Sequence, residues 1–245
     1  MIIQSVAQIT SIYRPRYVII LEVFLANWIY YLKTKRIIVE VVVIKAVLRA
    51  FYICSSSFLH SYYCTEVTIP KELHSLKKNR YVIVANHRRV IDPFLILTSL
   101  PAQTFHTILP IRFFTANVFL THVWQRLLMA PFGCFRAYST EGKVSGVKGG
   151  LKLSDAGQSL FIFPEGKRVN HTNKIQPKIG VAYLVQRRDF IVIPVHIDYV
   201  KNSFLKKTYI HWGKPFKVKD DIRFHDLDKV TKHIFNKVQS LAHKK

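Results

Sequence analysis

His87 and Asp92 lie five residues apart and are the side chains in this sequence best suited to acid–base chemistry as a pair. A carboxylate that holds an imidazole fixes its tautomer and stabilises the imidazolium that forms when the ring takes a proton. On an extended chain the two residues would be about 17 Å apart, and on a regular helix their side chains would point roughly 140° apart. A tight turn between them is therefore required.

Two further polar segments carry groups suited to an anionic substrate. The candidate substrate-binding residues are Arg136, Glu165, Gly166, Lys167 and Arg168. Arginine offers forked donors that match a phosphate, and lysine adds a point charge. No serine or cysteine stands next to His87 in the sequence as a nucleophile. We therefore expect the histidine to activate a hydroxyl group of the substrate.

Short apolar strands must position these three segments. Residues 81–85 are apolar and rich in β-branched types, as in a buried strand, and Asn86 and His87 follow directly. Asp92 precedes Pro93, which predicts an N-cap followed by proline at the first helical position. Strands are also expected at residues 131–136 and 159–163. Because ligands gather at the carboxyl ends of strands in helix-covered sheets, the three segments are expected to converge on one pocket.

The rest of the chain from Thr65 alternates short strands with helices. Further strands are expected at residues 65–69, 104–109, 190–196 and 208–212, and helices at residues 93–100, 116–129, 143–155, 176–187 and 227–243. The Lys-rich residues 71–80 are expected to form a surface connection. This alternation predicts an α/β fold with a mixed, mostly parallel sheet covered by helices.

Residues 1–64 differ in composition from the rest. As a helix, the apolar residues 17–32 would cover about 24 Å, short of the ~30 Å hydrocarbon core of a bilayer. Residues 37–64 carry Glu40, Lys45 and Arg49, which favours a helix lying partly in the membrane interface. We therefore predict membrane-docking helices over residues 1–64 and a catalytic domain over residues 65–245. The sequence leaves open whether residues 17–64 span the bilayer, lie on it, or pack as two helices on the core.

The composition is both basic and apolar. Lysine and arginine number 37 against 14 acidic residues, a net charge of +23, and hydrophobic residues make up 49%. Such a charge implies an anionic partner, and the apolar content favours a membrane surface over nucleic acid. The three cysteines show no metal-ligand spacing and indicate reduced thiols. We expect no metal and no nucleic acid, and a catalytic domain on the cytoplasmic face of a membrane.

Four segments resemble motifs of one enzyme family. Residues 86–92, NHRRVID, resemble the NHxxxxD motif of the glycerolipid acyltransferases, the 1-acylglycerol-3-phosphate acyltransferase family in particular. Residues 163–168, FPEGKR, resemble its FPEGTR motif, with Lys167 in place of threonine. Residues 133–136 match the second motif in glycine, phenylalanine and arginine, and residues 191–195 are similar to the fourth, an apolar strand with proline. The four motifs occur in the family's order, and the resemblance covers about residues 65–245.

The resemblance implies an O-acyltransferase of phospholipid biosynthesis. It would move a fatty acyl group from acyl-CoA or acyl carrier protein to the free hydroxyl of lysophosphatidic acid, with no other cofactor and no acyl-enzyme. By analogy His87 removes the hydroxyl proton and Asp92 orients His87. Glu165, Gly166 and Arg168, with Arg136, would hold the glycerol phosphate.

Two alternatives stay open at this stage. In the first, an acyltransferase of the same fold uses a different acceptor: another lysophospholipid, an amino-acid-linked lysolipid or glycerol phosphate. The other alternative is a non-enzymatic basic protein that coats membranes or nucleic acid. It leaves Asp92 and Glu165 unexplained, because acidic residues repel a phosphate partner.

Overall fold

The structure is a computed structural model that describes residues 16–116, 120–137, 145–169, 176–201, 206–221 and 226–242. The chain forms two compact units, Met1–Val43 and Ile44–Lys245. In the first unit the last residues of the helix expose a run of apolar side chains. These are Ile37, Ile38, Val39, Val42 and Val43. The predicted boundary between a membrane-docking region and a catalytic domain at residue 64 stays a prediction.

One continuous helix, α2 (Arg16–Tyr62), replaces the two helices expected from the sequence. Neither proline nor glycine interrupts these residues, so nothing in them ends a helix. The part of α2 in the second unit packs on the core through buried Ile44 and Leu48. Tyr52 stacks on Phe105 with ring centroids 4.5 Å apart. In the part of the chain that the structure describes, no helix has both the length and the apolar character needed to cross a membrane.

The described strands form one mixed sheet in the order β1-β7-β6-β2-β5-β3-β4. The strands are β1 (Thr65–Thr68), β2 (Tyr81–Ala85), β3 (Ile111–Thr115), β4 (Cys134–Arg136), β5 (Ser159–Ile162), β6 (Ile191–Lys201) and β7 (Lys206–Trp212). Only the β6–β7 pair is antiparallel among these strands. This confirms the predicted α/β class with a mixed, mostly parallel sheet.

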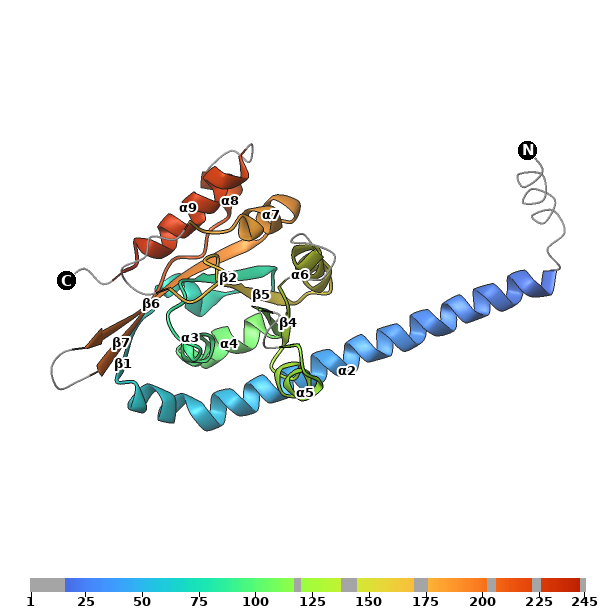
Figure 1. Ribbon diagram of the computed structural model, residues 1–245, viewed down its shortest axis with the longest axis horizontal. Helices are drawn as coiled ribbons and strands as arrows, with labels where there is room; N and C mark the ends of the chain where they lie inside the picture. The colour runs from blue at the N-terminus through green and yellow to red at the C-terminus, as the bar shows by residue number, and fades with distance from the viewer. Residues whose placement is uncertain are drawn as a thin grey trace. The chain divides into compact units, whose positions relative to one another are not determined.

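Helices cover both faces of the sheet (Figure 1). Beyond α2, the described helices are η1 (Lys71–Ser75), α3 (Asp92–Thr98), α4 (Ala102–Ile108), α5 (Val123–Met129), α6 (Ser145–Asp155), α7 (Gly180–Arg187), α8 (Val218–Asp221) and α9 (Leu227–Gln239). Side chains of β2 alternate between two buried clusters. Ile83 and Ala85 pack with α2, α3 and α4, whereas Val82 and Val84 pack with α7 and α9. A strand buried on both faces explains why residues 81–85 are apolar without interruption.

The sequence expectation was wrong at residues 104–109, which form most of helix α4 and not a strand. Their β-branched and aromatic composition suggested a strand. The buried residues Thr104, Phe105 and Ile108 nevertheless follow the helical spacing of one and four residues. The strand of this region is β3, after Pro110, which the sequence reading missed.

Other boundaries also differ from those expected. The helix expected at residues 116–129 is described only as α5, over Val123–Met129, and residues 117–119 lie outside the described chain. The helix expected from residue 176 begins at Gly180. The expected surface connection at residues 71–80 contains the short helix η1, which buries Leu73.

Candidate active site

The turn after β2 brings His87 and Asp92 together. The Nδ1 atom of His87 lies 3.0 Å from Oδ2 of Asp92. The same oxygen accepts hydrogen bonds from the backbone N–H groups of Arg88 at 2.6 Å and Arg89 at 2.7 Å. The Asp92 side chain is fully buried, whereas the His87 side chain keeps 18% of its surface exposed. The tight turn that the spacing requires is thus confirmed.

Asp92 does not act as the N-cap that the sequence predicted. The N-cap of α3 is Ile91, and no side chain caps this helix. Pro93 has no N–H to donate. The carboxylate instead accepts bonds from the turn that precedes the helix, so it holds the backbone around His87 in place.

The contact with Asp92 determines which nitrogen of His87 carries the proton. An ionised carboxylate only accepts hydrogen bonds, so we assign the proton of the neutral ring to Nδ1. The Nε2 atom then carries a lone pair, as a general base requires. The His87 ring also stacks on Phe163, with centroids 4.0 Å apart and an interplanar angle of 16°. These two contacts fix the orientation of the ring.

The FPEGKR segment after β5 holds the backbone of the His87 turn. Oε2 of Glu165 accepts a hydrogen bond from the His87 backbone N–H at 2.9 Å. The Val169 N–H donates to the His87 carbonyl at 2.9 Å, and the Arg88 guanidinium donates to the Val169 carbonyl at 2.9 Å. Burial raises the pKa of the Glu165 carboxyl, although the His87 N–H and the positive charge of Arg88 oppose that rise.

Strand β6 supports the same turn through its backbone at Ile197, which binds Asn86, and through the Tyr199 side chain, which no sequence motif contains. The Asn86 amide donates to the Ile197 carbonyl at 2.8 Å and accepts from the Ile197 N–H at 2.7 Å. The Tyr199 hydroxyl donates to Oδ1 of Asp92 at 2.6 Å. Burial, with the nearby charge of Asp92, raises the pKa of Tyr199, so its hydroxyl stays protonated. These contacts depend on the pairing of β2 with β6, which no local sequence signal reveals.

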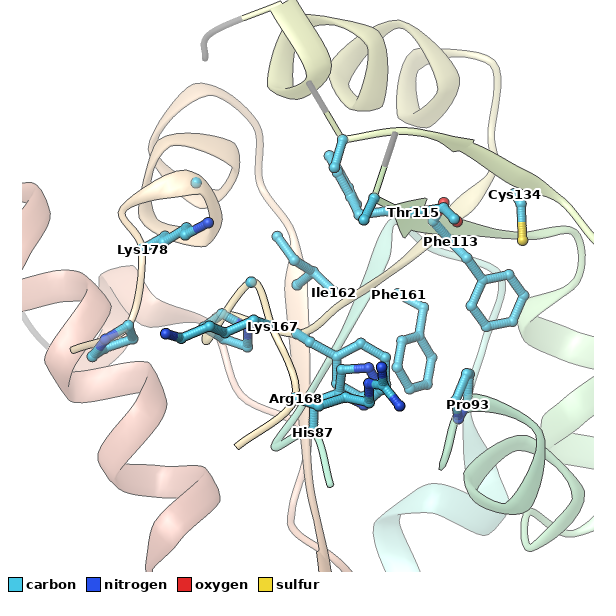
Figure 2. A pocket seen from close by; sticks show the side chains of 18 of the residues that line it. His87, Pro93, Phe113, Thr115, Cys134, Phe161, Ile162, Lys167, Arg168 and Lys178 are labelled. Atoms are coloured by element: carbon cyan, nitrogen blue, oxygen red, sulfur yellow. The ribbon is translucent and has the colours of Figure 1, made fainter. Parts of the chain in front are cut away.

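A cavity of about 1410 Å³ lies beside His87. Its lining is mostly apolar and aromatic, and includes Phe113, Phe132 and Phe161. Its lysine and arginine lining residues are Arg88, Lys167, Arg168 and Lys178. Figure 2 shows Lys167 and Lys178 on one side of the cavity and Phe113, Phe161 and Pro93 on the other. The cavity therefore offers cationic groups for an anion and an apolar space for a hydrocarbon chain.

The segments after β2, β4 and β5 leave the same edge of the sheet, because these strands are parallel. Gly166, Lys167 and Arg168 line the cavity. Glu165 is only 4% exposed and contacts the His87 turn. Arg136 ends β4, is exposed, and donates to the Leu120 carbonyl at 3.2 Å.

Only some of the predicted substrate-binding residues therefore line the cavity. Neither Glu165 nor Arg136 is among the residues that line it. Lys178, at the beginning of the segment that leads into α7, supplies a cation there instead. A Cβ at Gly166, where φ is +65°, would lie 2.5 Å from the Lys178 Nζ atom, so the absence of a side chain lets Lys178 approach the loop. Among the described residues, no three His, Cys, Asp or Glu side chains are grouped to hold a metal ion.

The mostly parallel sheet places a His–Asp pair at a strand's carboxyl end beside a cationic and apolar cavity, an arrangement suited to an α/β enzyme that uses histidine as a base. The chain belongs to the acyltransferase family, whose model matches residues 65–198. The predicted family and the predicted O-acyltransferase activity are thereby confirmed, and the non-enzymatic alternative does not fit.

A solved structure shares this fold. It is the 1-acyl-sn-glycerophosphate (LPA) acyltransferase PlsC from Thermotoga maritima, with a TM-score of 0.59 and 16% sequence identity. The similarity covers 82% of this chain and 83% of that one. A comparison with curated proteins finds no match.

Proposed function

We propose that this enzyme transfers a fatty acyl group from acyl-CoA or acyl carrier protein to the free hydroxyl of lysophosphatidic acid. The observation that carries the proposal is the His87–Asp92 contact of 3.0 Å at a cavity with a cationic side and an apolar interior. One acceptor molecule joins a hydroxyl, a phosphate and a hydrocarbon chain, and this site has a group suited to each.

The proposed reaction uses His87 as the base. Its Nε2 atom takes the proton of the acceptor hydroxyl while the oxygen attacks the thioester carbonyl carbon. The resulting tetrahedral intermediate collapses with cleavage of the C–S bond, and the proton passes from His87 to the departing thiolate. Asp92 stabilises the imidazolium between the two transfers, and no acyl-enzyme is formed. The products are a diacylated phospholipid and a free thiol.

The acceptor phosphate is proposed to bind Lys167 and Arg168. Both side chains are exposed and line the cavity. Arginine matches phosphate through paired donors, and lysine adds a strong point charge. Lys178 joins this group from the segment before α7. Glu165 is proposed to act indirectly by holding the His87 turn, because its carboxylate bonds to the His87 backbone.

We further propose that the enzyme works at a membrane surface, on its cytoplasmic face. The net charge of +23 favours an anionic phospholipid surface. Exposed apolar side chains on α2, such as Ile53 at 73% and Phe58 at 68%, suit insertion at the interface. The acyl thioester is a co-substrate, and no further cofactor is proposed.

The test measures transfer of a labelled acyl chain from acyl-CoA to lysophosphatidic acid, lysophosphatidylcholine, an amino-acid-linked lysolipid and glycerol 3-phosphate. We expect lysophosphatidic acid to be the preferred acceptor and His87→Ala to abolish transfer. The variant should bind vesicles as the wild type does and keep its circular dichroism spectrum. Turnover that survives in His87→Ala contradicts the mechanism. Preference for another acceptor contradicts the substrate assignment.

A further inference from the structure

Helix α5 (Val123–Met129) is an unusual element of the catalytic unit because none of its residues is buried. Four of its seven side chains are large, apolar and exposed: Val123 at 67%, Trp124 at 60%, Leu127 at 71% and Leu128 at 57%. Single exposed apolar residues are common on soluble proteins, but a contiguous group of this size marks an interaction site. We call these four residues the α5 patch.

The α5 patch is continuous with the catalytic cavity. Met129 ends α5 and lines the cavity, as does Phe132 three residues later. The rim carries two more exposed apolar side chains, Val90 at 55% and Ile179 at 48%, which also line the cavity. Apolar lining therefore extends from the C-terminal end of α5 to the space beside His87.

The chemistry of the patch favours a phospholipid bilayer over a protein partner. Trp124 is suited to the membrane–water interface, where indole rings gather. Arg126 lies on the same short helix, and the chain carries +23, which attracts anionic lipids. Seven residues are far too few to span a bilayer, so such a helix lies within the interface.

We propose that the α5 patch inserts into the surface of an anionic phospholipid bilayer and that the C-terminal end of α5 is where lipid chains pass between bilayer and cavity. The second part rests on the proposed function, because it requires a lipid substrate. The first part does not depend on activity. In this arrangement the acceptor hydroxyl reaches His87 while the hydrocarbon chain still contacts apolar surface along its whole path.

Insertion is tested by fluorescence in the full chain with Trp28→Phe, which leaves Trp124 and the buried Trp212. Vesicles of phosphatidylglycerol and phosphatidylcholine are prepared with and without brominated acyl chains, which quench nearby indoles. We expect about twofold quenching of the emission from Trp124, since an interfacial indole lies close to the acyl chains. Adding Trp124→Phe should remove the quenching. Quenching that is absent, or that survives Trp124→Phe, overturns insertion of the patch.

The lipid path is tested with Leu127→Asp, and Gln103→Asp on the exposed side of α4 controls for the added charge. Each protein is assayed on long-chain lysophosphatidic acid in vesicles and on a short-chain, water-soluble form. We expect Leu127→Asp to lower turnover of the vesicle substrate on the order of tenfold, because an apolar contact is replaced by a charge, and to leave the soluble substrate unaffected. Equal effects on both substrates, or none, overturn the lipid path. A wild type that acylates neither substrate instead overturns the proposed function.

Discussion

The Tyr199 hydroxyl is the donor to Asp92 that no sequence motif contains, and Tyr199→Phe removes it alone. The lost bond is 2.6 Å long and runs to the Oδ1 atom of a fully buried carboxylate. Hydrogen bonds to charged groups contribute about 1.5–3 kcal/mol, which corresponds to roughly 10- to 150-fold if the loss falls entirely on the transition state. Because Asp92 keeps the Nδ1 atom of His87 and two backbone donors, we expect the lower part of that range in kcat.

The pH profile separates a role in catalysis from a role in folding. Tyr199 stays neutral because burial and the charge of Asp92 raise its pKa, so its hydroxyl donates throughout the assay range. Without this donor Asp92 is held less firmly, which lowers kcat, while its carboxylate keeps more negative charge beside the imidazolium. The acid limb of the kcat/KM profile should therefore move to higher pH in Tyr199→Phe.

A matched control is Tyr52→Phe, which removes a hydroxyl that donates to the Leu100 carbonyl at 2.8 Å, away from the His–Asp pair. Both variants should lose stability, measured as the free energy of unfolding in urea. Only Tyr199→Phe should lower kcat and shift the profile. If Tyr199→Phe keeps the wild-type kcat and profile, or if Tyr52→Phe changes them equally, the argument that Tyr199 positions the pair through Asp92 is refuted.

Other predictions concern the turn and its support. Glu165→Ala should lower kcat about 10- to 100-fold, because the His87 N–H loses a charged acceptor, and Glu165→Gln should lower it less; a change confined to KM for the acceptor would instead indicate direct binding. Because the pKa of Glu165 is raised in the native state, the free energy of unfolding of the wild type falls as pH rises from the ordinary carboxyl range through that pKa. Glu165→Gln lacks this titration, so its melting temperature relative to that of the wild type should be higher at neutral pH than at acidic pH. Asn86→Ala should reduce the free energy of unfolding by about 2–4 kcal/mol in urea titrations, since two buried bonds to β6 are lost; a loss under about 0.5 kcal/mol would contradict this. Gly133→Ala should lower the melting temperature strongly, because φ is +83° and the new Cβ would lie 2.3 Å from the Ile111 carbonyl oxygen; an unchanged melting temperature would refute the clash.

The alternation of strands and helices and the order of the polar segments were readable from the sequence. Apolar runs at residues 81–85, rich in β-branched types, and at residues 159–163 predict buried strands, because a sheet with both faces covered removes such short runs from water. The five-residue spacing of His87 and Asp92 required a tight turn for any contact between them. Covalent geometry alone showed that the two side chains can meet only through such a turn, and the apolar run before them placed it at the end of a strand.

Local patterns failed where a helix or strand depends on what packs against it. Residues 104–109 have strand-like composition but form helix α4, because tertiary packing buries Thr104, Phe105 and Ile108 on one helical face. The two apolar runs of the N-terminal region, which differ in charge, suggested two helices. No proline or glycine separates the runs, so α2 continues from one into the other.

Only the tertiary structure determined which distant residues hold the His–Asp pair in place. Tyr199 lies 107 residues from Asp92 and meets it only because β6 pairs with β2. Tertiary structure also separates the roles of Glu165 and the three residues that follow it. The loop after β5 turns the Glu165 carboxylate toward the His87 backbone, whereas Gly166, Lys167 and Arg168 line the cavity. A sequence specifies which groups are present and their separation along the chain. Which of them share a buried space depends on strand pairing between distant residues, and that pairing is fixed by the packing of the whole sheet.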